Sequence, residues 1–246
     1  MPEPAPACGY NALFVIAFRM QKLLIVSATR AAPGPFMETM PLGQSLRRIS
    51  YDRRLEIRIA FNNRAGLPSV YNRQITEENR DKMLLFVHDD VWLDDCFVHD
   101  RVREALEAFD IVGLAGNTRR QPRQPAWGFE QEDPFIPVER AFLSGIVADG
   151  DTAWGRPSRY GPPGLECVML DGVFLAVRCG TLLDRGVRFD ERFAFDFYDI
   201  DFCRSAEAAG LRMGTWPIAI THTSVGKFGS PAWRAGLQAY REKWGD

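Results

Sequence analysis

Two acidic residues directly follow an apolar run in this 246-residue chain. The run covers residues 84–87 (Leu-Leu-Phe-Val), and Asp89 and Asp90 come shortly after it, before Val91. Such a run predicts a buried strand, and ligands of open α/β sheets bind at the carboxyl ends of strands. Carboxylate oxygens there suit a hard divalent cation, which usually also takes oxygens from a substrate phosphate. The alternative is that Asp89 and Asp90 only cap a turn.

A second acidic segment lies further along, where Asp196, Asp199 and Asp201 alternate with aromatic and aliphatic residues. Asp199 and Asp201 fall at the start of a predicted helix over 199–209, where negative charge is favourable. Capping accounts for one carboxylate, but not easily for three in such apolar company. A carboxylate in a partly desolvated setting can act as a general base. The sequence thus offers one acidic cluster for metal and phosphate, and another for proton abstraction.

The elements that must position these residues alternate between strands and helices. An amphipathic helix is predicted over 95–109, with Asp94 or Asp95 as its cap. Strands alternating with helices indicate an α/β fold with a mostly parallel sheet and right-handed crossovers. The other predicted helices cover 44–51 and 68–79, and the predicted strands cover 23–27, 55–61, 83–87, 111–114, 173–177 and 215–220.

Two segments depart from this alternation. Residues 116–166 are rich in Pro and Gly, and we predict a long irregular insertion there that faces a substrate. The arginines of that segment, Arg119, Arg120 and Arg123, are interpreted as a solvated charge run, although an anionic acceptor is an alternative. Near the end, Ser230-Pro231 predicts a helix start, and we expect the apolar face of that helix to dock on the core.

Composition excludes several classes of protein. A net charge of −2 argues against nucleic acid as a partner. Five scattered cysteines without a Cys-x-x-Cys pair favour a reducing cytoplasm over a disulfide framework or a zinc site. The apolar run 12–18 is too short to span a bilayer, and residues 1–19 are interpreted as an extension outside a core domain over 20–246.

Taken in order, these segments resemble glycosyltransferase family 2. The resemblance covers roughly residues 21–228, and its motifs are His-Asp-Asp-Val at 88–91, Leu-Asp-Gly-Val-Phe-Leu-Ala-Val-Arg at 170–178 and Phe-Tyr-Asp-Ile-Asp-Phe-Cys-Arg at 197–204. More narrowly, the chain is similar to the bacterial branch related to the streptomycin-biosynthesis StrF domain. The resemblance implies a single GT-A domain, with a donor half over about 20–115 and an acceptor half over about 116–246.

The resemblance also implies roles on the donor side. Asp90 would bind Mn²⁺ or Mg²⁺, with His88 in the place of the family's first Asp and His222 as an extra imidazole ligand. The alternative for His222 is a hydrogen-bonded histidine at a strand end. The residues implied to contact the nucleotide sugar are Ser27, Ala28, Thr29, Asn62, Asn63 and Asp89.

On the acceptor side, the resemblance implies that Asp199 is the catalytic base and that Asp171, Gly172 and Asp201 face the acceptor. The alternative for Asp201 is that it only orients Arg204 or caps the helix. The implied reaction moves a sugar from a nucleoside-diphosphate sugar to a hydroxyl of a saccharide or other acceptor, with inversion, in cell-surface polysaccharide or glycoconjugate synthesis. Peripheral membrane association is compatible with this role. The rival interpretations are a non-catalytic sugar-nucleotide-binding domain and, less favoured, a nucleotidyltransferase.

Overall fold

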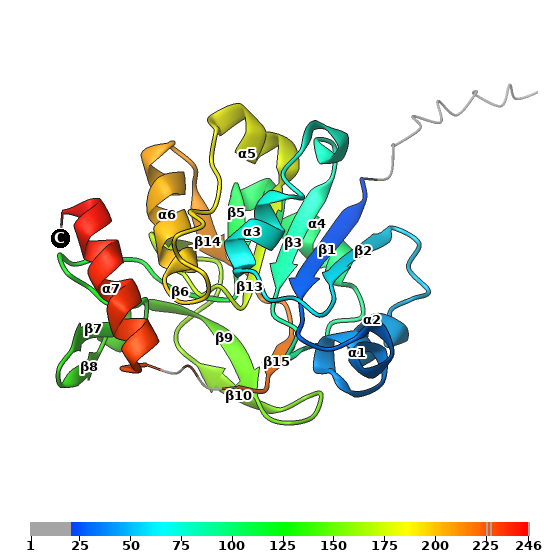
Figure 1. Cartoon of the computed structure of the whole chain (residues 1–246), viewed down its shortest axis with the longest axis horizontal. Coiled ribbons are helices and arrows are strands. Elements are labelled where there is room, and N and C mark those ends of the chain that lie inside the picture. The colour runs from blue at the N-terminus through cyan, green and yellow to red at the C-terminus, as the bar shows by residue number, and fades with distance from the viewer. Residues whose placement is uncertain (1–20, 225, 227, 246) are drawn as a thin grey trace, which may run out of the picture.

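A seven-stranded sheet forms the centre of the molecule, with helices on both faces (Figure 1). The computed structural model describes residues 21–224, 226 and 228–245, so the extension predicted over 1–19 lies outside the described residues. The strand order is β11-β14-β5-β13-β3-β1-β2. These strands are β1 (Leu23–Ala28), β2 (Leu55–Ala60), β3 (Met83–Val87), β5 (Ile111–Gly113), β11 (Glu166–Cys167), β13 (Phe174–Arg178) and β14 (Met213–Thr215).

Strand direction confirms the predicted α/β class. Strand β1 pairs in parallel with β2 and β3, and β14 pairs in parallel with β5. Strand β13 runs antiparallel between β3 and β5, and β11 runs antiparallel beside β14. As a result, β1, β2, β3, β5 and β14 all point in one direction, and their carboxyl ends meet at one edge of the sheet.

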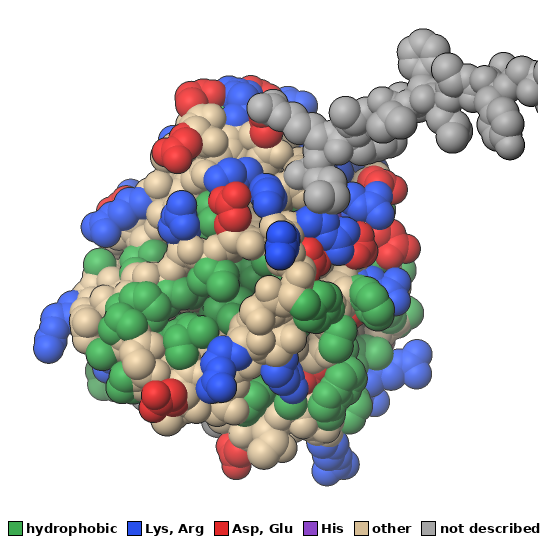
Figure 2. Space-filling view, turned by 90° about the vertical axis from the view of Figure 1, so that its right-hand side faces the viewer, with side chains coloured by type: hydrophobic (Ala, Val, Ile, Leu, Met, Phe, Trp, Pro, Cys, Tyr) green, Lys and Arg blue, Asp and Glu red, His purple; other side chains and the backbone are tan. Residues whose placement is uncertain are grey.

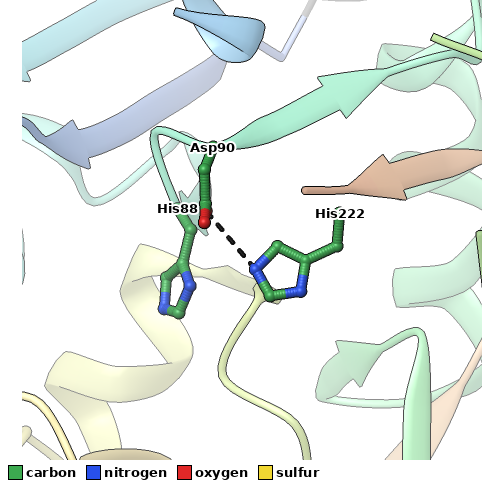
Figure 3. Close-up of side chains that lie close together, drawn as sticks. All are labelled: His88, Asp90 and His222. Carbon is green, nitrogen blue, oxygen red and sulfur yellow. Dashed lines mark ion pairs between the residues drawn. The ribbon is translucent and has the colours of Figure 1, made fainter. Parts of the chain in front are cut away.

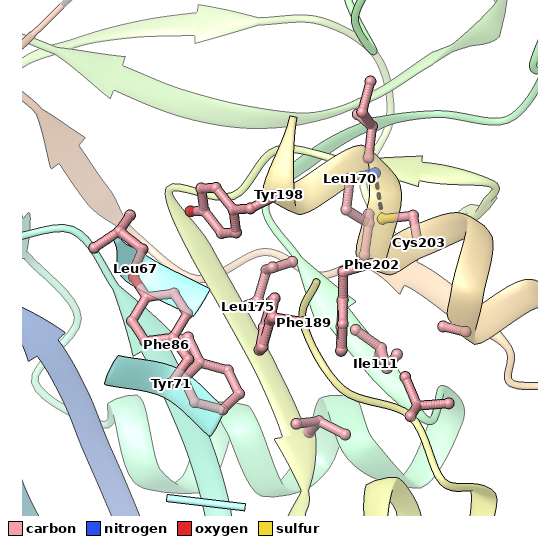
Figure 4. Packing of buried hydrophobic residues seen from close by; sticks show 14 of the residues in the cluster. Leu67, Tyr71, Phe86, Ile111, Leu170, Leu175, Phe189, Tyr198, Phe202 and Cys203 are labelled. Atoms are coloured by element: carbon pink, nitrogen blue, oxygen red, sulfur yellow. Dashed lines mark hydrogen bonds between the residues drawn. The ribbon is translucent and has the colours of Figure 1, made fainter. Parts of the chain in front are cut away.

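Alternate residues of the central strands enter two separate hydrophobic clusters, because successive side chains of a strand point to opposite faces. Leu84 and Phe86 of β3 pack toward α3, α5, α6 and α7, whereas Leu85 and Val87 pack toward α1, α2 and α4. Figure 4 shows Phe86 in the first cluster, with Tyr71 of α3 and Phe202 of α6. The helices are α1 (Pro33–Thr39), α2 (Pro41–Arg48), α3 (Leu67–Asn72), α4 (Val98–Ala108), α5 (Cys179–Arg185), α6 (Tyr198–Ala208) and α7 (Pro231–Trp244).

The region predicted to be irregular, 116–166, is more regular than its Pro and Gly content indicates. It supplies three of the six strands of a second sheet, namely β6, β9 and β10, and a separate β7–β8 hairpin. The order in this sheet is β12-β6-β9-β15-β4, with β10 beside β9. These strands are β4 (Val91–Leu93), β6 (Ala115–Asn117), β7 (Phe129–Glu132), β8 (Phe135–Pro137), β9 (Leu143–Asp149), β10 (Arg156–Arg159), β12 (Met169–Leu170) and β15 (Ile220–His222).

The chain passes between the two sheets close to the residues singled out in the sequence. It leaves the central sheet at residues 88–90, between β3 and β4, and again at Leu114, between β5 and β6. It returns at residues 171–173, between β12 and β13. The strand predicted over 215–220 is wrong as one element, since it is divided between β14 of the central sheet and β15 of the second sheet.

The helix ends follow the sequence in part. Ser230 accepts a hydrogen bond from the Trp233 N–H and Pro231 occupies the first turn of α7, as predicted. Helix α4, however, begins at Val98 without a side-chain cap, so the predicted capping is wrong. Asp95 instead accepts the Phe97 N–H before the helix, and Asp94 accepts the Thr221 hydroxyl of β15.

Figure 2 views the side on which β2, α1 and α2 lie, where hydrophobic side chains are exposed among Lys and Arg. Strand β2 is the last strand of the central sheet on this side, and its Ile57 is 40% exposed. Among the described helices, none combines the length and the apolar character that a membrane crossing requires.

Candidate metal centre and catalytic base

The ends of β1, β2 and β3 bring the predicted nucleotide contacts to one edge of the sheet. The loop after β2 is tied to the loop after β1, because the Asn63 N–H donates to the Thr29 carbonyl at 2.8 Å and the Asn62 N–H to the Ala31 carbonyl at 3.0 Å. The Thr29 hydroxyl lies beside Asp89 and lowers its pKa, although burial outweighs this and raises the pKa overall. Ser27, Ala28 and Thr29 are buried, Asn63 and Asp89 are half-buried, and Asn62 is exposed.

His88, Asp90 and His222 form a cluster at the same edge (Figure 3). One potential ligand atom from each residue lies within 4.8 Å of the other two. The neighbouring strands position the cluster: β4 follows Asp90 directly, and its Val91 pairs with His222 of β15. The three residues for which the resemblance implies metal binding are therefore adjacent in space, although His222 is far from the other two in sequence.

The charges in this cluster support one another. Burial opposes ionisation of Asp90, but hydrogen bonds from His222 and Ser224 lower its pKa to about 2. The distances are 3.3 Å from Asp90 Oδ1 to His222 Nε2 and 2.5 Å from Asp90 Oδ2 to Ser224 Oγ. Burial lowers the pKa of His222, but the Asp90 carboxylate outweighs it and raises the pKa overall. Asp90 is thus an anion near neutral pH, which a cation ligand requires.

His88 is held in the form that can bind a metal. The Tyr198 hydroxyl donates to the Gly172 carbonyl at 2.8 Å and lies 2.9 Å from His88 Nε2. Because the hydroxyl hydrogen is used, His88 Nε2 donates to Tyr198, and Nδ1 keeps its lone pair. Burial also lowers the pKa of His88 and keeps the ring neutral. Two imidazoles and a carboxylate are together a donor set that can hold a divalent metal ion.

Asp199 lies in the first turn of α6 with its carboxylate fixed by backbone groups. The Gly172 N–H donates to Oδ2 at 3.0 Å, and the Ile200 N–H donates to Oδ1 at 2.9 Å. Desolvation by burial, with a smaller contribution from the Asp171 charge, raises the pKa of Asp199 to about 7. A carboxyl group with such a pKa can accept a proton near neutral pH.

Gly172, in the connection between β12 and β13, permits the close approach of this connection to α6. A Cβ atom at Gly172 would lie 2.3 Å from the Tyr198 hydroxyl and 2.9 Å from Asp199 Cβ. Because the Gly172 carbonyl accepts from Tyr198 while its N–H donates to Asp199, one residue holds both side chains. Tyr198 therefore links the metal cluster, through His88, to the residue that positions the base.

The other two predicted acceptor residues, Asp171 and Asp201, lie in different environments. Asp171 is half-buried beside the site, where it accepts Trp127 Nε1 at 2.8 Å and the Val173 N–H at 2.8 Å. Asp201 is fully buried and pairs with Lys243 Nζ at 2.7 Å and Trp244 Nε1 at 2.8 Å, both in α7. The prediction that Asp201 faces an acceptor is therefore wrong; its carboxylate instead anchors α7 to α6.

Sequence reasoning missed two residues that shape the site. Phe197, which precedes α6, has a φ of +69°, an unusual conformation for a bulky residue and one that is frequent at functional sites. Its ring packs against Trp233 and Tyr240 of α7, which hold the conformation that aims α6 at Gly172. Phe195 is 58% exposed and stacks on His88 with ring centroids 5.6 Å apart. The only sequence signal was the alternation of aromatic and acidic residues.

No protein-family model matches this chain, and no curated protein matches it in sequence. Among solved structures, similar ones include the mannosyltransferase PcManGT from Pyrobaculum calidifontis in complex with GDP-Man and Mn²⁺, at 13% identity and a TM-score of 0.49, covering 92% of this chain and 64% of that one. S. aureus TarS in complex with UDP gives 14% identity and a TM-score of 0.43, covering 83% and 61%. A197 from STIV gives 12% identity and a TM-score of 0.44, covering 79% and 81%.

This chain spans less than two thirds of the length of the PcManGT and TarS chains. At such identities and TM-scores, the similarities assign no family. The functional argument therefore depends on the chain's own site: a His-Asp-His cluster and a desolvated carboxylate, joined through Tyr198 and Gly172, at the carboxyl edge of an α/β sheet.

Proposed function

We propose that this chain is a metal-dependent glycosyltransferase of the GT-A type, which moves a sugar from a nucleoside-diphosphate sugar to a hydroxyl group. The observation that carries the proposal is the pairing of the His88–Asp90–His222 cluster with Asp199, whose pKa is about 7. A cation site beside a poised carboxylate supplies the two things this reaction needs, namely charge stabilisation for the leaving diphosphate and removal of a proton from the acceptor.

On the donor side, the nucleotide would lie along the ends of β1 and β2, against Thr29 and Asn63. Asp89, which follows β3 and lies beside Thr29, would approach the ribose or the sugar. A divalent cation held by Asp90, His222 and His88 would neutralise the charge that develops on the diphosphate. The exposed ring of Phe195 would cover this end of the site and exclude water.

On the acceptor side, Asp199 would take the proton from the attacking hydroxyl. The hydroxyl oxygen forms a bond to the anomeric carbon as the bond from that carbon to the diphosphate oxygen breaks. A single displacement of this kind inverts the anomeric centre. The backbone N–H groups of Gly172 and Ile200 hold the carboxylate in one orientation, which favours attack from a fixed direction. Asp171 and Trp127 would line the acceptor side of the reacting carbon.

We further infer membership of glycosyltransferase family 2, in its StrF-like branch, and a role in the synthesis of cell-surface polysaccharide or glycoconjugate. The support is the order of the motifs at 88–91, 170–178 and 197–204 along the chain. These motifs contain His88 and Asp90, Gly172, and Asp199 respectively.

The test is release of nucleoside diphosphate when the full chain is incubated with a panel of sugar nucleotides and Mn²⁺. We expect release with at least one donor, loss of release with a chelator, and loss in the Asp199→Asn variant. The assay is repeated with a panel of divalent metals and a panel of acceptor saccharides. Binding of a sugar nucleotide without release under any of these conditions would favour the non-catalytic sugar-nucleotide-binding domain instead.

A further inference from the structure

A cavity of about 630 Å³ opens in the second sheet, around the β9–β10 hairpin. Its charged lining comprises Arg140, Arg156, Arg159 and Asp149, and Tyr160 forms part of its wall. A cavity of this size can hold a sugar ring together with a charged substituent. Its lining lies in the segment that was predicted to be irregular, so no sequence pattern indicated it.

Strand register places this cavity next to the candidate active site. Asp149 at the end of β9 pairs with Arg156 of β10 on one side and with His222 of β15 on the other. Register thus places Arg156 one strand beyond Asp149, which itself pairs with the metal-cluster residue His222. In Figure 1, β9, β10 and β15 lie together on the side of the molecule away from α5.

A second connection runs through aromatic residues. The Tyr160 ring meets the Trp127 ring edge-on, with centroids 4.9 Å apart, and Trp127 donates its indole N–H to Asp171. Asp171 lies close enough to Asp199 to raise the pKa of that base. Two lining residues therefore connect the cavity to the candidate site: Asp149, which pairs with His222, and Tyr160, which contacts Trp127.

The three arginines of the cavity lack the partners that other arginines of this region have. Arg119 pairs with Glu130 at 2.7 Å, and Arg120 pairs with Glu207 at 2.6 Å. Within the described residues, no carboxylate lies within 4.0 Å of the guanidinium groups of Arg140, Arg156 or Arg159, although Arg140 donates to the Arg159 carbonyl at 3.3 Å.

Asp149, the acidic residue of the lining, accepts a hydrogen bond from the Ser158 hydroxyl. The cavity therefore carries an excess of two positive charges from three arginines and one aspartate. Guanidinium groups stay charged at any physiological pH, and their forked donors match the oxygens of phosphate and carboxylate groups.

We propose that this cavity binds the acceptor through an oxyanion, so that the acceptor is a phosphate- or carboxylate-bearing saccharide rather than a neutral one. Arg140, Arg156 and Arg159 hold the anionic group, while Tyr160 and Trp127 contact the sugar ring and direct its hydroxyl toward Asp199. This inference rests on the proposed function for the identity of the site as an acceptor site, but the anion binding can be measured separately.

The test is a thermal-shift titration of the full chain with four probes, at constant ionic strength and with a chelator present. The probes are inorganic phosphate, a hexose phosphate, a hexuronate and the uncharged hexose. We expect saturable stabilisation by phosphate and by at least one sugar anion, and none by the hexose. A preference for hexose phosphate or hexuronate then identifies which oxyanion the acceptor carries.

Variants locate the binding. Arg156→Ala and the double variant Arg140→Ala/Arg159→Ala should weaken anion binding roughly tenfold or more, the scale of a lost charge-assisted hydrogen bond. Arg156→Lys should lose less, since it keeps the charge but not the fork. Arg58→Ala is the matched control, because Arg58 is an exposed arginine on β2, outside the cavity. Unchanged anion binding in the cavity variants, or equal weakening by Arg58→Ala, would overturn the proposal.

Nucleoside diphosphate with Mn²⁺ separates this inference from the proposed function. The cavity variants should bind GDP or UDP as the unmodified chain does, because Asp90 and Thr29 are untouched. If nucleotide binding is present and anion binding does not depend on the three arginines, the inference fails alone. If anion binding depends on them but no nucleotide binds, the proposed donor site fails while the anion site stands.

Discussion

At the scale of single residues, Tyr198 and Asp199 reach Gly172 through opposite ends of its backbone. Tyr198 donates to the Gly172 carbonyl, and Asp199 accepts from the Gly172 N–H. Tyr198 also accepts from His88 of the candidate metal cluster. A displacement of His88 would therefore be transmitted to Asp199 through the hydrogen bonds of Tyr198 and Gly172.

Asp199→Asn should reduce turnover by roughly 10²-fold or more, the scale of a lost general base. Burial raises the pKa of Asp199 to about 7, so turnover of the unmodified chain should rise with pH, reaching half its plateau near pH 7. The measurement is nucleoside diphosphate release from pH 5.5 to 9, with donor affinity as the control. A flat pH profile together with near-normal turnover in the variant would remove Asp199 from the mechanism.

The same shift has a consequence for stability. Because the folded-state pKa of Asp199 is raised above the ordinary value of 3.8, the folded chain holds a proton there that the unfolded chain releases. This contribution is fully present below pH 3.8 and is lost as pH rises through about 7. Asn does not titrate, so the free energy of unfolding of Asp199→Asn should rise relative to that of the unmodified chain when the pH is raised from 5 to 8. Urea unfolding at the two pH values measures this. A difference in unfolding free energy between variant and unmodified chain that is the same at pH 5 and pH 8 would contradict the raised pKa.

Asp90→Asn should abolish the Mn²⁺-dependent part of nucleotide binding and leave the fold intact. The neutral amide cannot pair with His222 or supply the negative charge that holds a cation. Titration calorimetry with and without a chelator measures the effect, and Asp184→Asn, an exposed aspartate that pairs with Arg80, is the control. Equal nucleotide affinity with Mn²⁺ and with a chelator in the unmodified chain would show that the cluster does not bind the donor through a metal.

At the scale of elements, the contact between α7 and the start of α6 determines where Asp199 points. Gly236 of α7 faces the Phe197 ring so closely that a Cβ atom there would lie 2.7 Å from Phe197 Cδ2. That ring is confined by Trp233 and Tyr240, and the Asp201–Lys243 pair fixes the far end of the helix. The position of Asp199, the proposed base, thus depends on α7, a helix that contributes no residue to the candidate site.

Gly236→Ala should lower the free energy of unfolding by about 1 kcal/mol, because overpacking costs about 1–3 kcal/mol and exceeds the helix-propensity gain of about 1 kcal/mol. It should also lower turnover more than donor affinity, since the displaced Phe197 moves Asp199 and not the metal cluster. Gly34→Ala in α1 is the control, because a Cβ there meets nothing within 4 Å. A Gly236→Ala variant as stable and active as Gly34→Ala would contradict the positioning role.

Helices and strands could be predicted where a local sequence pattern is enough to determine them. Strand β3 occupies residues 83–87 as expected, because an apolar strand buried on both faces is an uninterrupted apolar run. The second sheet was missed because β6, β12 and β15 have only two or three residues each, and β10 is mostly exposed. Such short strands are stabilised by pairing with distant segments, which leaves no local signal.

The residues of the candidate site likewise divide into those with a local sequence signal and those without one. Asp89, Asp90 and Asp199 stand out in sequence because carboxylates interrupt apolar segments. Ser224 and Trp127, which hold Asp90 and Asp171, carry no such signal, since their role arises only when the strands are paired. Asp201 was misassigned because its ion pair with Lys243 joins residues far apart in the chain, and no sequence pattern indicates that pairing.

At the scale of the whole molecule, donor binding should be visible as stabilisation. A ligand that binds only the folded state at a hundred times its Kd adds about 2.7 kcal/mol, which for a chain of this size is a Tm increase of about 5–10 °C. We expect this increase with GDP or UDP and Mn²⁺ together, and a much smaller one with either alone. A nucleotide effect that is the same with a chelator would contradict a metal-bridged diphosphate.

The division into a donor half over 20–115 and an acceptor half over 116–246 does not correspond to separate bodies in space. Strands β13, β14 and β11 complete the central sheet from the later half, and β4 joins the second sheet from the earlier half. The junctions at 88–90, 114 and 171–173 surround the metal cluster and Gly172, so both sheets meet at the candidate site.

This interleaving sets an order of events on the ribosome. Strand β3 has emerged long before β13, the strand that must pair with its free edge, and an unpaired edge strand invites association with other chains. A nascent chain stalled after residue 165 should therefore stay protease-sensitive or bind a chaperone, and protection should appear only once residues 174–215 have emerged. Protection from protease that increases step by step in nascent chains shorter than this would contradict the expectation. A nascent chain that lacks residues 174–222 has neither β13 nor His222, so we expect it to bind neither nucleotide nor metal.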